Sequence, residues 1–219
     1  MMNEIKCKIC NSKNLKIIDD KKVNNVYYHC QECDFVFEQE EKLVSNEIEL
    51  KVYQGHNNTI ENVGYVNMFN KFMVKTVDKY CKDKKNVLEF GSGPGPVLAE
   101  LLKQKGYEVD IYDPYFSPEK VFEGKKYDII TSTEVFEHFN DPLKEIGLLK
   151  KILKKDGYLC IMTRFHPKDE EKFKNWWYRR DLTHISFYTP KTFKYIANKF
   201  DLEIIFYDDR DICVFKNKL

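Results

Sequence analysis

Three glycines at alternate positions, Gly91, Gly93 and Gly95, are the feature of this sequence that most restricts its fold. They follow the apolar run 87–90 and precede a helical pattern of apolar residues over 97–102. An apolar run, a glycine turn and a helix in this order predict a strand, a tight turn and a helix of an α/β sheet. Glycine allows backbone angles that are barred to other residues, and the amides that start the helix can then face a ligand. The stretch therefore predicts a ligand-binding turn.

Glu89 narrows the class of ligand. It lies two residues before the first glycine, where a carboxylate suits a cationic ligand better than a pyrophosphate. The dinucleotide pattern G-x-G-x-x-G would place its last glycine at position 96, which is proline. Glu89 with Gly91-x-Gly93-x-Gly95 resembles motif I of the class I S-adenosylmethionine methyltransferases, in which an acidic residue and this glycine pattern bind the cofactor. The resemblance covers residues 55–219 and is to the broad ubiquinone-methylase-like group.

Composition limits the cellular setting and the partners. The chain has 219 residues and a formal charge of +1, so its overall charge gives no reason to expect a nucleic-acid partner. It has no apolar run of about 18 residues and its start lacks the apolar core of a signal peptide. We therefore expect a cytoplasmic protein with no membrane span. Its seven cysteines are then expected to be metal ligands or buried thiols.

Four of the cysteines form two C-x-x-C pairs, Cys7 with Cys10 and Cys30 with Cys33. Nineteen residues separate the pairs, a spacing that fits the tetrahedral thiolate site of a zinc ribbon. Short strands are expected beside the second pair, at 26–29 and 35–37. We predict a structural Zn²⁺ that folds residues 1–40, the alternative being four free cysteines in a loop-rich tail.

Residues 41–80 are expected to form a helical connector or lid. The acidic stretch 39–50 reads as a solvated connector, and polar, turn-forming residues follow up to Tyr65. An amphipathic helix is then predicted to Tyr80. The resemblance implies that this segment covers the cofactor, with Tyr65, His56 and Asn57 as candidate contacts.

Residues 81–219 are predicted to form the methyltransferase domain. Strand 107–113 ends at Asp113, eighteen residues past Gly95, where nucleotide-binding α/β folds place the acid that pairs with ribose hydroxyls. The resemblance makes Asp113, Pro114 and Tyr115 cofactor contacts. Only about a dozen residues separate this loop from the next strand, so the usual helix and third strand are expected to be trimmed.

Two later stretches are predicted to surround the methyl acceptor. A strand is expected at 127–131, and the stretch 131–142 that follows it directly should face the methyl group, with Thr133 as a cofactor contact. A helix is expected to start at Asp141-Pro142 and to be ended by 154–157. The connection 164–188, with both tryptophans, reads as a wall or lid around the pocket, or equally as an apolar plug. A final antiparallel hairpin matches the class I methyltransferase pattern.

Glu134, Glu137 and His138 form a Glu-x-x-Glu-His group. On a helix beginning at Glu134 these side chains would share one face. Such a group with a later histidine resembles the metal sites of small-RNA 2′-O-methyltransferases and ubiquinone-biosynthesis O-methyltransferases. The resemblance implies that Glu134, Glu137, His138 and His184 are catalytic and hold a divalent ion, Mg²⁺ or Zn²⁺. Without a metal, His138, His166 or His184 would be the general base.

The sequence thus predicts an α/β, Rossmann-like class I methyltransferase sheet with a small N-terminal zinc ribbon. The expected reaction is S-adenosylmethionine-dependent O-methyl transfer to a small-molecule or nucleotide-derived hydroxyl. One alternative is methylation of RNA or protein, with the ribbon docking the substrate and Arg164, Lys168, Arg179 and Arg180 contacting phosphates. A non-enzymatic alternative is a zinc-ribbon binding module with a degenerate cofactor fold.

Overall fold

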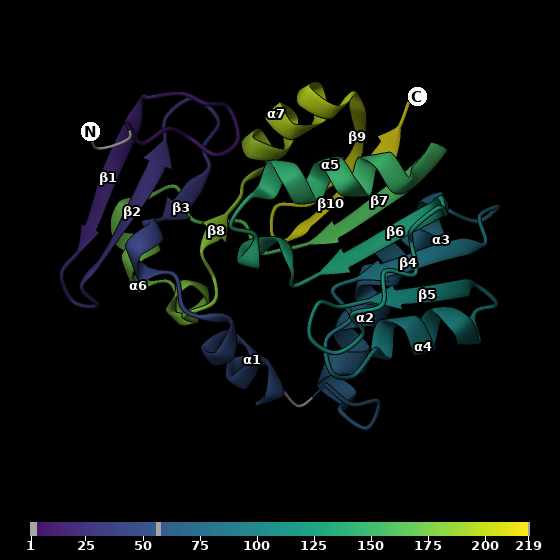
Figure 1. The fold of residues 1–219 in the computed structure, drawn as a ribbon. Coiled ribbons are helices and arrows are strands. Elements are labelled where there is room, and N and C mark those ends of the chain that lie inside the picture. Colours follow the sequence, from purple (N-terminus) through teal and green to yellow (C-terminus); the bar gives the residue numbers. More distant parts are fainter. Residues whose placement is uncertain (1–3, 56–57, 219) are drawn as a thin grey trace.

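The computed structural model describes residues 4–55 and 58–218, which form two sheets and their covering helices (Figure 1). His56 and Asn57, two of the candidate cofactor contacts, lie outside the described residues. The larger sheet has the strand order β5-β4-β6-β7-β10-β9. Its strands are β4 (Asn86–Phe90), β5 (Glu108–Tyr112), β6 (Tyr127–Thr133), β7 (Leu153–Met162), β9 (Leu202–Tyr207) and β10 (Ile212–Asn217).

The direction of these strands confirms the Rossmann-like prediction. Strands β4 to β7 are parallel, whereas β10 runs antiparallel between β7 and β9. No strand forms in the described stretch 113–126 apart from an isolated bridge between Asp113 and Ser117. The third strand is therefore trimmed, as the short spacing predicts.

Alternating apolar residues fix which face of the sheet each helix covers. Val87 packs in one core cluster with α2 (Val63–Lys75), α3 (Val77–Tyr80) and α4 (Val97–Gln104), whereas its neighbour Leu88 packs in the other with α5 (Pro142–Ile152) and α7 (Pro190–Phe200). These strands are apolar on both faces because helices cover both. Polar caps start the helices: Asp141 accepts from the backbone N–H of Lys144, and Thr189 and Thr192 form a capping box.

The smaller sheet lies beside the two C-x-x-C pairs, and Cys30 ends its strand β2. Its order is β1 (Leu15–Asp20), β2 (Asn25–Cys30), β3 (Val36–Glu38) and β8 (Ser186–Phe187), all antiparallel. The fourth strand comes from the far end of the chain, from the connection that the sequence predicts as a lid. The amino-terminal sheet is therefore completed by residues that lie about 150 positions downstream.

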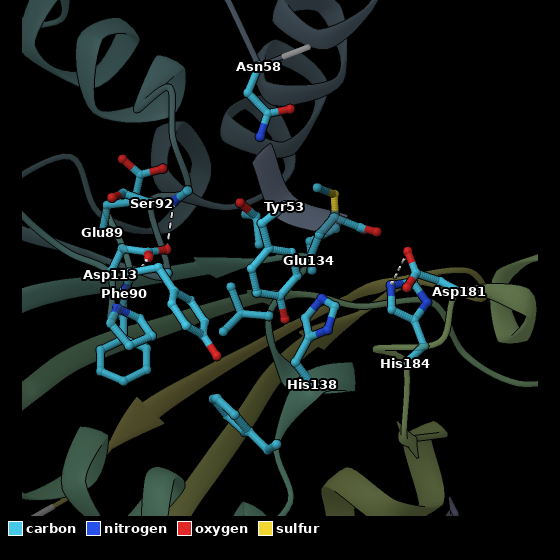
Figure 2. A pocket seen from close by; sticks show the side chains of 18 of the residues that line it. Tyr53, Asn58, Glu89, Phe90, Ser92, Asp113, Glu134, His138, Asp181 and His184 are labelled. Carbon is cyan, nitrogen blue, oxygen red and sulfur yellow. Dashed lines mark hydrogen bonds and ion pairs between the residues drawn. The ribbon is translucent and has the colours of Figure 1, made fainter. Parts of the chain in front are cut away.

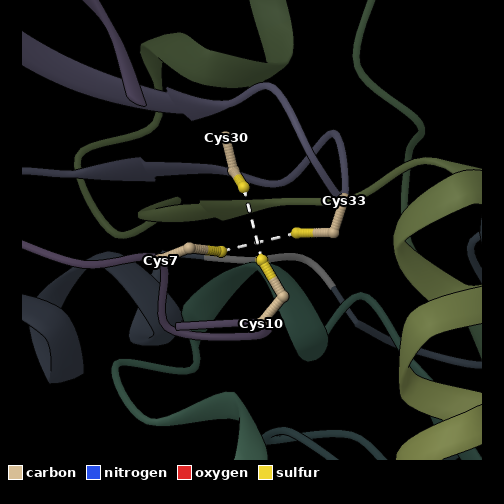
Figure 3. A group of neighbouring side chains, drawn as sticks. All are labelled: Cys7, Cys10, Cys30 and Cys33. Carbon is tan, nitrogen blue, oxygen red and sulfur yellow. Dashed lines mark hydrogen bonds between the residues drawn. The ribbon is translucent and has the colours of Figure 1, made fainter. Parts of the chain in front are cut away.

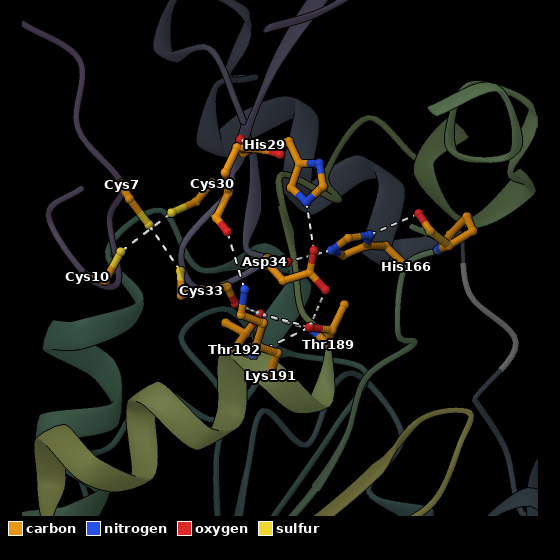
Figure 4. A network of polar contacts seen from close by, with 12 residues as sticks. Cys7, Cys10, His29, Cys30, Cys33, Asp34, His166, Thr189, Lys191 and Thr192 are labelled. Carbon is orange, nitrogen blue, oxygen red and sulfur yellow. Dashed lines mark hydrogen bonds and ion pairs between the residues drawn. The ribbon is translucent and has the colours of Figure 1, made fainter. Parts of the chain in front are cut away.

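Polar contacts also join this sheet to α7 (Figure 4). The Thr189 hydroxyl donates to Asp34 at 3.1 Å, and the Thr192 hydroxyl donates to the carbonyl of Cys33 at 3.0 Å. His166 donates from Nε2 to the carbonyl of Asp34 at 2.7 Å and is 4% exposed. The prediction that His166 is a candidate general base is wrong, because its imidazole is buried at this junction and does not line the cavity described below.

A buried ion pair forms a second bridge. The Arg179 guanidinium lies 2.5 Å from the Asp20 carboxylate, and both side chains are almost fully buried. Arg179 also donates from Nε to the carbonyl of Phe173 at 3.1 Å. Because the Arg179 side chain is buried, it cannot contact a phosphate of bound RNA. The alternative in which Arg179 is a phosphate contact is therefore wrong.

One local prediction was wrong. The stretch 154–157, expected to end the helix that starts at Pro142, lies within β7 as a bulge, with Asp156 at φ 57°, and the helix ends at Ile152. The acidic stretch 39–50 contains a short 3-10 turn (Glu40–Lys42) and the start of helix α1 (Asn46–Gln54), neither of which has a buried residue. The lid segment contains α6 (Glu170–Asn175) and a 3-10 turn (Trp177–Arg180). Among the described helices, none has the length and apolar character to cross a membrane.

Candidate active site

A cavity of about 1040 Å³ lies where the parallel strands β4, β5 and β6 end (Figure 2). The carboxyl ends of parallel strands are where open α/β sheets bind ligands. Most of the predicted site residues line it: Tyr65, Glu89, Gly91, Gly93, Asp113, Pro114, Tyr115, Thr133, Glu134, His138 and His184. Gly95 and Glu137 lie beside the cavity and not on its wall.

The three glycines serve different purposes. Gly91 and Gly93 have φ values of 83° and 64°, which favour glycine. A Cβ on Gly91 would also lie 2.3 Å from a methyl of Val135, and one on Gly95 would lie 1.7 Å from the carbonyl oxygen of Asn58. Gly95 is therefore required by the chain segment that crosses the turn at Asn58.

Glu89 is buried at the base of the turn. Its carboxylate accepts a hydrogen bond from the N–H of Ala99 in the first turn of α4 at 2.9 Å. Burial raises the pKa of Glu89 to about 8. A cationic group of a ligand would offset this desolvation and favour the ionised carboxylate.

Asp113 and Ser92 also line the end of the cavity beside the glycine turn. Asp113 accepts from the N–H groups of Gly93 and Tyr115, each at 2.9 Å, so its carboxylate fixes both loops. The Ser92 hydroxyl lines the cavity, is buried and has no hydrogen-bond partner among the described residues. A buried polar atom without a partner is costly, so a bound ligand with a polar group fits here. These donors and acceptors suit S-adenosylmethionine.

Helix α1 contributes a wall that the sequence did not reveal. The Tyr53 ring lies 5.6 Å from the Tyr115 ring and 5.2 Å from the His138 ring, between the two ends of the cavity. Glu49 accepts hydrogen bonds from the hydroxyls of both tyrosines. From the segment 41–80, Tyr53, Asn58 and Tyr65 line the cavity. Tyr53 gave no signal because it sits in a stretch rich in polar and turn-forming residues.

Glu134 does not start a helix. It has φ 55°, a left-handed conformation that is strained in a residue with a side chain. Helical geometry begins only in the 3-10 turn Phe136–His138, so the predicted shared helix face of Glu134, Glu137 and His138 is wrong. Burial raises the pKa of the Glu134 carboxyl to about 8, and the neighbouring Glu137 adds to the rise.

Glu137, His138 and His184 nevertheless converge. One ligand atom from each lies within 4.8 Å of the others, and Glu134 is not part of this group. His138 Nδ1 lies 2.9 Å from the carbonyl of Thr183, and His184 Nδ1 lies 2.7 Å from the carbonyl of Tyr178. Because a carbonyl only accepts, each Nδ1 carries the proton and Nε2 keeps its lone pair. Metal-binding histidines are oriented in this way.

Tyr178 connects the two glutamates. Its hydroxyl contacts the carboxylates of Glu134, at 3.1 Å, and Glu137. The second Glu137 oxygen accepts from the Thr163 hydroxyl at 2.9 Å. Glu137 is fully buried, and burial raises its pKa. A cation between Glu137 and the two imidazoles would offset that cost.

The two tryptophans have separate roles. Trp177 is 60% exposed and lines the cavity, where the guanidinium of Arg164 lies 5.2 Å from its ring centroid. Trp176 packs against Phe173 and Phe187 under the smaller sheet. The sequence left a cavity wall and an apolar plug as alternatives for the two tryptophans. Trp177 lies on the cavity wall, and Trp176 lies in an apolar cluster.

The four amino-terminal cysteines gather at one point (Figure 3). Cys7 and Cys33 sulfurs lie 3.4 Å apart, Cys10 and Cys30 sulfurs lie 3.5 Å apart, and all four lie within 4.8 Å of one another. Zinc–sulfur bonds of about 2.3 Å in a tetrahedron place sulfurs roughly 3.8 Å apart. Burial raises the pKa of Cys10 to about 11, a cost that a divalent cation would remove. The geometry fits the predicted zinc site.

Comparison with known proteins defines the class. A family model described as a methyltransferase domain matches residues 67–206, about two thirds of the chain. The protein therefore belongs to the methyltransferase-domain family, with the α/β fold of class I S-adenosylmethionine methyltransferases.

Individual relatives are distant. The uncharacterized methyltransferase YcgJ of Bacillus subtilis is 24% identical over 139 residues, which cover 52% of this chain and about half, 54%, of that relative. The crystal structure of magnesium protoporphyrin IX methyltransferase from Synechocystis PCC 6803 with bound SAH is similar at a TM-score of 0.51, with 15% identity, over 71% of this chain and 84% of that one. The crystal structure of TnmH has a TM-score of 0.50 and 14% identity, over 71% and 59% of the two chains.

Proposed function

We propose that this protein transfers a methyl group from S-adenosylmethionine to a hydroxyl of a small molecule, with a divalent cation held by Glu137, His138 and His184. The observation that carries the proposal is the convergence of these three side chains at the acceptor end of the cavity that the glycine turn and Asp113 begin. Bound S-adenosylmethionine would supply an electrophilic methyl group.

The chain's own residues divide the work. Asp113 and Ser92 offer an acceptor and a hydroxyl to the cofactor's polar groups, and Glu89 offers a carboxylate to its cationic end. Tyr53 and Tyr65 cover the centre of the cavity and exclude water. Holding two reactants in line can lower the barrier by several kcal/mol.

The donor set also indicates the kind of metal. Two imidazoles and one carboxylate suit Zn²⁺ or a similar transition metal better than Mg²⁺, which prefers oxygen ligands. A cation there would lower the pKa of an acceptor hydroxyl. Tyr178 and Thr163 orient Glu137 from behind, as outer hydrogen-bond partners of metal ligands do. We propose the four cysteines as a separate, structural Zn²⁺ site.

A small acceptor is favoured over RNA. Arg179, one of the four residues suggested as phosphate contacts, is buried against Asp20, and Arg164 lies against Trp177 on the cavity wall. Cavity residues also argue against a degenerate fold, since the predicted cofactor contacts Glu89, Gly91, Gly93 and Asp113 all line one space.

Metal analysis of the purified protein tests this proposal. We expect two Zn²⁺ per wild-type chain after zinc loading, and one in Glu137→Ala and His184→Ala. His29→Ala is the matched control, because His29, Asp34 and His166 form another group that could hold an ion. Two ions in all three variants would overturn the second site. Loss of an ion in His29→Ala alone would show that the second ion binds at His29, Asp34 and His166 instead.

A further inference from the structure

Arg164 is placed to bind an anion in the cavity. It lies two residues after the end of β7, is half-buried and lines the cavity. Its guanidinium lies over the Trp177 ring at 5.2 Å. Stacking fixes the plane of a guanidinium and leaves its N–H edge available for bidentate hydrogen bonds.

In the described part of the chain, no carboxylate or carbonyl accepts a hydrogen bond from the N–H groups of Arg164. Among residues 4–55 and 58–218, no ion pair within 4.0 Å and no hydrogen bond involves the guanidinium of Arg164 or of the exposed Arg180, which lines the same cavity. Glu134 and Asp211 lie close enough to Arg164 for a charge interaction, but each has another partner. Glu134 accepts from the Tyr178 hydroxyl at 3.1 Å. Asp211 pairs with Arg210 at 3.0 Å, and Asp181 accepts from the N–H and hydroxyl of Thr183 at 2.9 and 2.7 Å.

The two ends of the cavity therefore differ in charge. Acidic Glu49, Glu89 and Asp113 line the end near the glycine turn. At the end formed by residues 162–184 and the β9–β10 hairpin, three arginines outnumber the two acids Asp181 and Asp211; these arginines are Arg164, Arg180 and Arg210. Trp177 adds an exposed apolar face beside Arg164. An arginine next to an aromatic ring recognises a small molecule that has both an acidic group and an apolar body.

We propose that the methyl acceptor is a small organic acid, whose carboxylate or phosphate binds Arg164 and Arg180 while its apolar body lies against Trp177. This inference rests on the proposed methyl transfer and specifies the acceptor of that same site. The anionic group anchors the acceptor at the rim, and the hydroxyl at its other end reaches toward Glu137, His138 and His184.

Ligand-observed saturation-transfer NMR tests the proposal, with benzoate and phenyl phosphate as probes. With S-adenosylhomocysteine present, we expect wild-type protein to bind at least one probe saturably at millimolar concentration. Arg164→Ala should weaken that binding at least tenfold, and Arg164→Lys should weaken it less because it keeps the charge. Lys168→Ala, which changes an exposed lysine in the same connection that does not line the cavity, should bind as wild type does.

Two results would overturn the inference. One is binding of neither probe, or equal probe binding by wild type and Arg164→Ala, with thermal melts showing that both are folded. The other is at least tenfold weaker affinity of Arg164→Ala for S-adenosylhomocysteine with unchanged probe binding, which would assign Arg164 to the cofactor's own carboxylate. If wild type bound no S-adenosylhomocysteine, the proposed function would fail, while the titrations repeated without it would still test the arginines.

Discussion

The backbone N–H of Ile185 donates to the carbonyl of Glu137 at 2.8 Å, so the lid segment is joined directly to the loop that follows β6. The carbonyl of the same Ile185 accepts from the N–H of Glu38, in strand β3 of the smaller sheet, at 2.9 Å. One residue therefore connects the smaller sheet to the loop that holds Glu137 and His138. His184, the third member of the proposed metal group, precedes Ile185 directly in the chain.

This connection predicts that the structural zinc supports the active site. Cys33→Ser should remove one Zn²⁺ per chain and expose the amides of residues 7–38 to hydrogen exchange, because the metal supplies folding free energy to so small a unit. The same variant should bind the second ion more weakly. Cys81→Ser, a buried cysteine in the other core, is the control and should keep both ions. Unchanged zinc content in Cys33→Ser would contradict the four-cysteine site.

Tyr178→Phe tests the support of Glu137 without removing a ligand. The change deletes a hydroxyl that contacts the carboxylates of both Glu134 and Glu137. Loss of such an outer partner costs about 10–100-fold in metal affinity, and we expect a weakening of this size at the second site. Tyr195→Phe removes an exposed hydroxyl and should have no effect. Equal affinities in competition with a chelator would show that Tyr178 does not position Glu137.

Gly95→Ala tests the chain crossing over the glycine turn. The added methyl would meet the carbonyl of Asn58, so the segment above the turn must move. Overpacking of this kind costs about 1–3 kcal/mol, and we expect at least tenfold weaker binding of S-adenosylhomocysteine in calorimetry. Gly64→Ala, where the added methyl has room, provides the comparison. Equal affinity of both variants would mean that the crossing segment does not shape the cofactor site.

Glu89 predicts a pH dependence of stability in the ligand-free protein. Its folded pKa of about 8 lies above the model-peptide value of 4.5, so the folded state holds its proton more tightly than the unfolded state does. The resulting stability is complete below about pH 4.5 and is lost as pH rises towards 8. Each pKa unit corresponds to about 1.4 kcal/mol, so the loss amounts to several kcal/mol.

Urea denaturation at pH 5 and pH 8 measures this effect. Glu89→Gln keeps an acceptor for the N–H of Ala99 and should lose much less stability between the two pH values than wild type. It should also bind S-adenosylmethionine more weakly, because it has no charge to offer the cationic end. Glu100→Gln, at an exposed position on α4, should follow wild type. A wild-type protein that is as stable at pH 8 as at pH 5 would refute the prediction.

The sequence was most informative where local pattern decides structure. The strand, turn and helix around Gly91 could be predicted because apolar periodicity and glycine positions act over a few residues. Spacing alone also indicated the cysteine group. By contrast, Tyr53 and Ser186 depend on contacts with residues distant in the chain, which no local pattern encodes. Glu134 was misplaced because a strained left-handed residue contradicts the helical preference of its sequence.

The central claim, that the cavity binds S-adenosylmethionine, is tested most directly by calorimetric titration of the purified protein with that compound. We predict one site per chain, with a dissociation constant between about 1 μM and 1 mM, and at least tenfold weaker binding in Asp113→Asn. No saturable heat from folded wild-type protein would contradict the account, as would equal affinity of wild type and Asp113→Asn.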